Sequence, residues 1–204
     1  NCLDSEGYEA DDIIGTVATR MAEHGHPVVI VTGDKDMSQL VNERVRVYDI
    51  ARDTWLDEAA VQAKFGVTPA QIPELLSLIG DSVDNIPGVH GVGDKTARQI
   101  LGVCSSVEEL LAAPELDGRF TFRGRVDILR RIRENIDTVR LSRRLATIAC
   151  DAPIPVSAEV VRYRRGDARI LGPCATNWAS SESSTKSPSP NRHCSRSSNR
   201  FETN

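Results

Sequence analysis

The stretch that decides the fold is PVVIVTGDKD, residues 27–36. Residues 28–31 are an unbroken β-branched run ending at Thr32 and Gly33, which predicts a short strand buried on both faces, as in a parallel sheet. Ahead of it, residues 9–23 carry apolar side chains at helical spacing, and Gly25 and Pro27 close that segment. A helix followed by a buried strand indicates α/β winding.

Further along the chain, the alternation continues and then changes to helices. We expect a short helix over residues 36–40 and a second strand over 45–50, the pattern of a sheet covered by helices. Beyond Trp55 the periodicity predicts helices over 57–65, 69–79, 95–101 and 107–112, and an arginine-bearing helical stretch over 123–144. Thr68 before Pro69 is a sound helix start, since the hydroxyl can cap while proline occupies the first turn. The second half therefore forms a helical lobe.

These patterns predict an α/β fold with three parts. Residues 1–56 would form the sheet-containing part and residues 57–150 the helical lobe. From 151 to 204 we expect a disordered tail, because from Ser180 onward serines alternate with prolines, asparagines and scattered charges, a composition that cannot bury a core. That tail fits either a phosphorylatable linker or translation out of frame, and we favour the second.

Charge is unevenly distributed although the net charge is only −4. Acidic residues gather in the first ninety positions, and arginines crowd a later stretch, which suggests a metal-binding pole and a phosphate-binding pole. The arginines of that stretch are Arg119, Arg123, Arg125, Arg130, Arg131, Arg133, Arg140, Arg143 and Arg144.

The five cysteines are scattered without a C-x-x-C pair, which argues against a zinc module or a disulfide scaffold and favours a reducing cytoplasm. The sequence has no apolar run long enough to span a bilayer and no signal-peptide pattern at its start. Since the chain begins without Met, we expect that start to be an interior cut.

Seven carboxylates in three segments are the candidate metal ligands. In open α/β sheets ligands bind at the carboxyl ends of strands, where the pair after Val31 lies, so we expect the three segments to share a pocket. The seven residues are Glu9, Asp11, Asp12, Asp34, Asp36, Asp81 and Asp84.

Each acidic segment by itself also fits a structural role, as a helix-terminal acid or a turn. Together, so many converging carboxylates would repel one another strongly without cations. Carboxylates and water suit Mg²⁺ or Mn²⁺, so the set predicts a two-metal phosphodiester hydrolase. Lys35 lies between two of the aspartates and could contact a scissile phosphate, although a solvated lysine is the simpler interpretation.

A glycine-rich segment, IPGVHGVGDKTA over residues 86–97, leads directly into a helix. Glycines let the backbone turn sharply and let a phosphate approach the amides, and the helix N-terminus adds positive potential. The spacing fits neither the dinucleotide-binding nor the Walker pattern. An ordinary turn between helices is the alternative, but the arginine-rich stretch downstream favours a surface that tracks a DNA backbone.

Three ordered motifs resemble the 5′-to-3′ exonuclease domain of bacterial DNA polymerase I: GYEADDIIG at 7–15, TGDKDMSQL at 32–40 and GDSVDNIPG at 80–88. The resemblance runs from about residue 7 to about 151. It implies a nuclease of the flap endonuclease family, with a PIN-like parallel-sheet core, incomplete here, followed by a helix-hairpin-helix lobe that binds duplex DNA, often with a K⁺ ion. Such an enzyme, in the bacterial cytoplasm and at the nucleoid, trims RNA primers and 5′ flaps.

The resemblance also implies roles for individual residues. Glu9 and Asp11 would serve the first metal, with Asp12 adjacent. The second metal would be served by Asp34, Asp36, Asp81 and Asp84. Asp11, Asp34, Asp36 and Lys35 are the candidate catalytic residues. The candidate DNA contacts are Gly88, Gly91, Gly93, Lys95, Thr96, Arg123 and Arg125.

Departures from the family pattern temper this expectation. The family's two earlier acid-bearing strands and its basic helical arch have no counterpart in the sequence, and neither does a polymerase domain. We therefore expect poor folding or feeble cleavage from the chain by itself. The alternatives are a fragment that binds duplex DNA without cutting it, and a genomic relic or assembly error.

Overall fold

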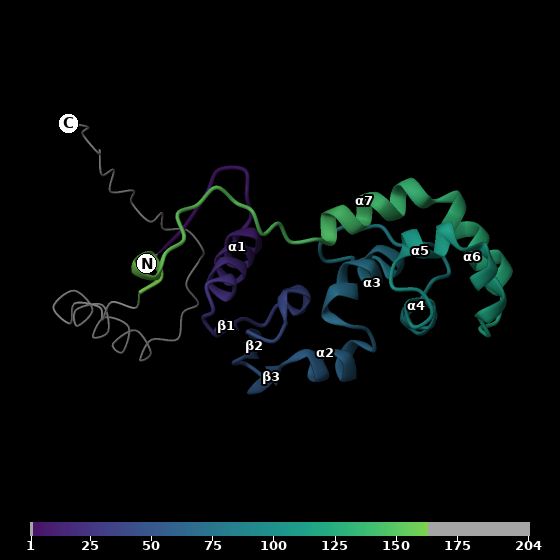
Figure 1. The fold of residues 1–204 in the computed structure, drawn as a ribbon. Coiled ribbons are helices and arrows are strands. Elements are labelled where there is room, and N and C mark those ends of the chain that lie inside the picture. Colours follow the sequence, from purple (N-terminus) through teal and green to yellow (C-terminus); the bar gives the residue numbers. More distant parts are fainter. Residues whose placement is uncertain (1, 163–204) are drawn as a thin grey trace, which may run out of the picture. The chain divides into compact units, whose positions relative to one another are not determined.

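The computed structural model describes residues 2–162, with the side chains of 115–117 excepted, and these residues belong to one compact unit. A helix, a small sheet and a set of further helices follow one another along the chain (Figure 1). The expected disordered tail beyond residue 162 lies outside the described residues. None of the described helices is long and apolar enough to cross a bilayer.

Helix α1, Ala10–Glu23, starts where its own side chains can satisfy the free amides of the first turn. Glu9 and Asp12 form a capping box, in which each side chain accepts a hydrogen bond from the other's backbone N–H. Ile13 and Ala18 are buried, so the expected amphipathic helix is present with its apolar face inward.

The sheet has the order β1-β2-β3, formed by Val28–Val31, Val45–Asp49 and Thr54–Leu56. The first two strands are parallel, as predicted, but the third is antiparallel to the second and was not predicted. Strand β3 is only three residues long, too short for a period-2 pattern to be read.

The prediction that the first strand is buried on both faces is wrong. Ile30 is buried, whereas Val29 and Val31 are 45% and 59% exposed. Side chains alternate across a strand, so these two valines lie on the same face of the sheet as Trp55, which is also exposed. A β-branched run signals a strand, but it does not say how many faces are covered.

One short helix lies between the first two strands, and a second leads from the sheet to the helical lobe. The 3-10 helix η1, Asp36–Leu40, follows β1 and matches the predicted short helix. Helix α2, Glu58–Phe65, is capped by the Asp57 side chain, which accepts from the backbone N–H of Ala60, and it ends at Gly66 in the left-handed region with φ 71°.

The helical lobe is built around α3, Ile72–Ile79, whose residues 72–78 are all buried. Helix α3 packs chiefly against α7 and α4. The elements of the lobe are η2 (Pro69–Gln71), α3, α4 (Asp94–Leu101), α5 (Val107–Ala112), η3 (Pro114–Arg119), α6 (Arg125–Glu134) and α7 (Ile136–Ala146).

The arginine-bearing stretch 123–144 is two helices. Asn135 interrupts it with φ −109° and ψ 23°, and its side-chain amide donates to the Arg131 carbonyl at 2.8 Å. Asn is a common residue at helix ends because its amide replaces lost helical hydrogen bonds. Helical periodicity continues across the break, which is why the sequence pattern does not reveal it.

After α7 the chain returns to α1 (Figure 1). Ala152 and Ile154 are buried against Ile13, and the Arg20 guanidinium donates to both of their carbonyl oxygens at 3.1 and 2.8 Å. The boundary placed at 150 is therefore too early, because this segment packs. Its few apolar residues form no period of their own, and α8, Ala158–Val161, follows it.

Candidate active site

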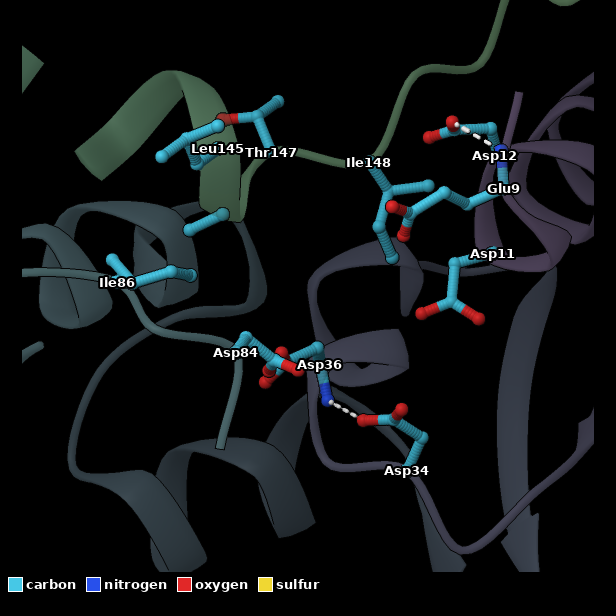
Figure 2. Close-up of a pocket in the computed structure, with 11 residues that line it drawn as sticks. Glu9, Asp11, Asp12, Asp34, Asp36, Asp84, Ile86, Leu145, Thr147 and Ile148 are labelled. Carbon is cyan, nitrogen blue, oxygen red and sulfur yellow. Dashed lines mark hydrogen bonds between the residues drawn. The ribbon is translucent and has the colours of Figure 1, made fainter. Parts of the chain in front are cut away.

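The candidate site is a cavity of about 250 Å³ between the start of α1, the end of β1 and the helical lobe. Figure 2 shows the carboxylates of α1 across the cavity from those that follow β1 and α3. The lining residues are Glu9, Asp11, Asp12, Asp34, Asp36, Asp84, Ile86, Leu145, Ala146, Thr147 and Ile148. Six of the seven carboxylates singled out in the sequence therefore surround one space.

The turn after β1 presents Asp34 and Asp36 through local hydrogen bonds. The Thr32 hydroxyl accepts from the Asp34 backbone N–H at 3.0 Å. The Asp34 carboxylate in turn accepts from the Asp36 N–H at 2.9 Å, as Figure 2 shows. Short polar side chains that bind nearby amides stabilise such turns. The turn directs both carboxylates to the cavity at the carboxyl end of the strand.

The loop after α3 presents Asp81 and Asp84. Asp81 and Ile86 pair through two backbone hydrogen bonds of 2.9 and 2.7 Å, which close the loop that contains Asp84. One oxygen from each of Asp36, Asp81 and Asp84 lies within 4.8 Å of the others. Asp81 itself lines a neighbouring cavity, where its carboxylate pairs with the Lys35 ammonium.

Mutual repulsion and burial act on the carboxylates of the cavity. Burial, followed by the charge of Asp34, raises the pKa of Asp36 from 3.8 to about 6. Burial, again with Asp34 as the largest charge, also raises the pKa of Asp11. In contrast, the hydrogen bond from Lys35 lowers the pKa of Asp81. The cavity thus holds more negative charge than its surroundings neutralise.

The donor set fits a hard divalent cation. One carboxylate oxygen of Asp36 is buried without any hydrogen-bond partner, and an orphaned buried acceptor is costly unless a ligand satisfies it. Asp81 and Asp84 offer further oxygens within coordination reach of that side chain. Carboxylate oxygens are the ligands that Mg²⁺ and Mn²⁺ prefer.

Asp12 differs from its neighbours because both of its oxygens already bind backbone amides. One accepts from the Glu9 N–H at 3.1 Å (Figure 2). The other accepts from the Ala149 N–H at 2.8 Å. The first bond starts α1 and the second attaches the segment after α7. These contacts favour an anchoring role for Asp12 beside the metal role that the resemblance implies.

Gln39 is a residue of the site to which sequence reasoning assigned no role. Its side chain donates to the Ala146 carbonyl at 3.0 Å and accepts from the Ile148 N–H at 3.0 Å, which holds the cavity wall against η1. Gln39 lies within TGDKDMSQL, three residues after Asp36. Only its place in that motif could have signalled its importance, because its partners are more than one hundred residues away.

The glycine-rich segment forms a hairpin between α3 and α4. A Cβ at Gly88 would meet the Ile79 backbone at 2.4 Å, so only glycine lets the two segments approach. Gly91 has φ +85°, and beside it the Arg131 guanidinium donates to the His90 carbonyl at 3.3 Å. The Ser142 hydroxyl donates to the Pro87 carbonyl at 2.5 Å, which fixes the hairpin to α7.

The candidate DNA-binding side chains flank this hairpin. Lys95 and Thr96 lie in the first turn of α4, and Lys95 is exposed. Arg123 and Arg125 are exposed near the start of α6, and within residues 2–162 neither has an ion pair. Several other arginines are paired with acids of the lobe, namely Arg98 with Asp94, Arg130 with Asp127 and Glu134, Arg140 with Glu108, and Arg143 with Glu74.

Comparison with known families agrees with this arrangement. A family model described as the N-terminal resolvase-like domain of 5′-3′ exonucleases matches residues 1–66, and one described as their C-terminal SAM fold matches residues 67–169. The chain belongs to the 5′-3′ exonuclease family. The two matches divide the chain ten residues later than the boundary predicted at 56, and the second runs past 150.

Curated relatives within this family are considerably longer than the chain. DNA polymerase I of Pseudomonas aeruginosa is 44% identical over 155 residues, which cover 76% of this chain and 17% of the polymerase. Flap endonuclease Xni of Vibrio cholerae is 35% identical over 164 residues, covering 80% of this chain and 60% of that protein. The exonuclease segment thus spans only part of either relative.

Solved structures support the fold. Phage T5 5′-exonuclease, in a structure described as having divalent zinc ions bound, superposes with a TM-score of 0.62 at 18% identity, covering 72% of this chain and 52% of that one. A second T5 structure, a flap endonuclease variant with DNA and metal ions, gives a TM-score of 0.58. The predicted nuclease-like α/β core with a helical lobe is confirmed, with a mixed rather than a purely parallel sheet.

Proposed function

We propose that the chain carries out divalent-metal-dependent phosphodiester hydrolysis on DNA with 5′ ends or flaps, including RNA primers paired to DNA. The observation that carries this proposal is the gathering of six carboxylates from three segments around one cavity, with a buried oxygen of Asp36 left without a partner. Membership of the 5′-3′ exonuclease family supports the same reaction class.

Two Mg²⁺ or Mn²⁺ ions would be held by two groups of carboxylates. Glu9 and Asp11 would serve the first, with Asp12 alongside, and Asp34, Asp36, Asp81 and Asp84 the second. The short separations among Asp36, Asp81 and Asp84 support the second group. Bound there, the ions would activate water for in-line attack and stabilise the charge that develops on the phosphate.

The chain's own contribution is to fix the carboxylates and to hold the substrate. The turn at Thr32 and the Asp81–Ile86 pairing fix the aspartates, so little reorganisation is needed when a phosphate arrives. Segment 145–148 forms one wall of the cavity and continues directly from α7, which connects the helical lobe to the site.

The hairpin would bind the duplex backbone. Its glycine amides and the start of α4 present N–H groups, Lys95 and Thr96 lie beside them, and Arg123 and Arg125 extend the basic surface. Backbone carbonyls of the hairpin would hold a K⁺ ion. Such contacts are with phosphates, so they would be largely independent of base sequence.

The proposal can be tested on the full 204-residue chain. Mn²⁺ binding is titrated directly, and cleavage of a 5′-flap duplex is measured with Mg²⁺ and with Ca²⁺. We expect saturable Mn²⁺ binding and weak Mg²⁺-dependent cleavage, which Asp36→Asn lowers about a hundredfold by removing a ligand.

The matched control is Asp127→Asn, an exposed aspartate on α6 that pairs with Arg130 away from the cavity. It should leave Mn²⁺ affinity and cleavage unchanged. Equal Mn²⁺ binding by the parent chain and by Asp36→Asn, with no Mg²⁺-dependent cleavage, contradicts the proposed reaction.

A second candidate function is duplex binding without cleavage. It is favoured by the exposed Arg123 and Arg125, which lack acidic partners in the described lobe. Duplex affinity in Ca²⁺ separates the two: Gly91→Ala should weaken it by straining a residue at φ +85°, whereas Gly118→Ala, in open space, should not. Binding that persists where no cleavage is found supports this second function.

A further inference from the structure

Lys35 carries an ion pair that the proposed cleavage does not explain. Its ammonium pairs with Asp81 in a cavity of about 330 Å³ that is separate from the acidic cavity and has Asp36 in common with it. Within residues 2–162, no other ion pair reaches any of the seven carboxylates. In the described part of the chain, Lys35 is thus the one cationic side chain that forms an ion pair with this cluster.

The two partners differ in how firmly they are held. The Asp81 side chain is 4% exposed, its second oxygen accepts from the Val83 N–H at 2.8 Å, and its backbone is paired with Ile86. The Lys35 side chain is 47% exposed, and its ammonium is carried by a flexible four-carbon chain. If the pair opens, the lysine is the partner that moves.

The position of the ammonium conflicts with that of a divalent cation. The Asp81 oxygen that pairs with Lys35 belongs to a carboxylate that also has one oxygen within 4.8 Å of an oxygen of Asp36 and an oxygen of Asp84. A divalent ion shared by these three carboxylates would lie a few ångströms from the ammonium. Two positive groups that close repel each other strongly in a partly buried site.

We propose that Lys35 is an exchangeable counter-ion, which neutralises Asp81 in the metal-free chain and is displaced toward solvent when a divalent cation binds the Asp36, Asp81 and Asp84 group. This inference rests on the proposed function and adds to it a competition that sets the metal affinity.

The test is a Mn²⁺ titration of the full chain, followed by the electron paramagnetic resonance of free Mn²⁺. Lys35→Met keeps the length of the side chain and removes the competing charge, so we expect it to bind Mn²⁺ about tenfold more tightly. Without metal, the same variant should melt at a lower temperature, and Mn²⁺ should raise that temperature by more than in the parent chain.

Two further variants complete the design. Lys64→Met removes a lysine that stacks over Phe65 on α2, so it should leave Mn²⁺ affinity unchanged. Lys35→Arg keeps the charge and should bind Mn²⁺ no more tightly than the parent chain. This variant tests the competition even if Lys35→Met folds poorly, because tighter Mn²⁺ binding by Lys35→Arg would contradict it.

The outcomes distinguish this inference from the proposed function. If Asp36→Asn loses Mn²⁺ affinity but Lys35→Met binds Mn²⁺ as weakly as the parent chain or more weakly, the proposed exchange is wrong. The proposed metal site is then still supported. Absence of saturable Mn²⁺ binding by the parent chain and by all variants overturns the proposed metal site and the exchange together.

Discussion

The acidic cavity gathers six carboxylates that form no ion pair within residues 2–162, whereas several arginines of the helical lobe are paired with acids of the same lobe. In the lobe, Arg140 is bidentate on Glu108, and Arg143 binds the buried Glu74. In the cavity, burial and then the like charge of neighbouring carboxylates raise the pKa of Asp36 and Asp11.

This difference supports the proposal that the acidic cavity binds an external cation. Charged side chains that pair with one another stabilise the fold. A group of like charges without counter-ions destabilises it, and such a group is therefore a candidate ligand-binding site. By this criterion we propose a structural role for the acids of the lobe and a metal-binding role for the carboxylates of the cavity. The same criterion favours exposed arginines such as Arg123 and Arg125 as the proposed phosphate contacts.

Removing a carboxylate from the lobe should cost the most stability. Glu74 accepts from the Val107 N–H at 3.2 Å and from Arg143 at 3.1 Å, so Glu74→Ala leaves a buried amide and an arginine without their partner. We expect a loss of about 3 kcal/mol in the free energy of unfolding, measured by urea titration. Glu108→Ala, which breaks an exposed pair with Arg140, should cost less than about 1 kcal/mol. Equal losses would contradict the distinction between the two pairs.

The second-largest loss of stability should come from removing the hydrogen bonds that join η1, beside the acidic cavity, to the end of α7. Gln39→Leu removes the hydrogen bonds to Ala146 and Ile148, and we expect a loss of about 2 kcal/mol in unfolding free energy. Amide hydrogen exchange at Ile148 should accelerate in the same variant. Gln62→Leu on the exposed face of α2 is the control and should change neither quantity. Unaltered exchange at Ile148 would show that Gln39 does not hold the wall.

Removing a carboxylate from the cavity should increase the stability of the metal-free chain, whereas removing one from the lobe should decrease it. The pKa of Asp36 in the folded chain is about 6, above its ordinary 3.8, so the folded state binds this proton more tightly than the unfolded state does. The stability that this proton contributes is present near pH 4 and is lost as the pH rises through about 6.

Metal-free Asp36→Asn should therefore gain stability over the parent chain as the pH rises, by about 1–3 kcal/mol at pH 7. Thermal melts in EDTA at a series of pH values measure this difference. Mn²⁺ should bind the parent chain more weakly below pH 6, because the cation must displace the same proton. A variant that is less stable than the parent at pH 7 without metal would show that the cavity carries no surplus charge.

The smallest effect concerns the arginines of the lobe. Arg125→Ala removes an exposed arginine without an acidic partner, and we expect a few-fold loss of duplex affinity and a reduction of about one in the salt slope. Arg140→Ala removes an arginine already engaged by Glu108, so its effect on the slope should be smaller. Fluorescence anisotropy over a range of KCl concentrations measures both. Equal slopes would remove the distinction between paired and unpaired arginines.

Local patterns predicted the helices and the two parallel strands well. Helix α5 has the predicted bounds, and Thr68 and Asp57 start helical segments because their side chains bind the first free amides. The predictions are wrong at positions whose structure depends on residues outside the local sequence pattern. The exposure of Val31, the strand β3 and the break at Asn135 depend on neighbours that periodicity does not encode.

By itself, the sequence determined which residue types are suited to the proposed chemistry and where the chain turns. Carboxylates directly after the strand that ends at Val31, and glycines directly before Lys95, each suit only a few structural or binding roles. Only the tertiary structure decided which charges remain unpaired. Glu74 with Arg143, Lys35 with Asp81, and Gln39 with Ile148 join residues far apart in the chain. Ion pairs and hydrogen bonds depend on the distance between side chains in space. That distance is set by the packing of the core and cannot be read from the order of the residues.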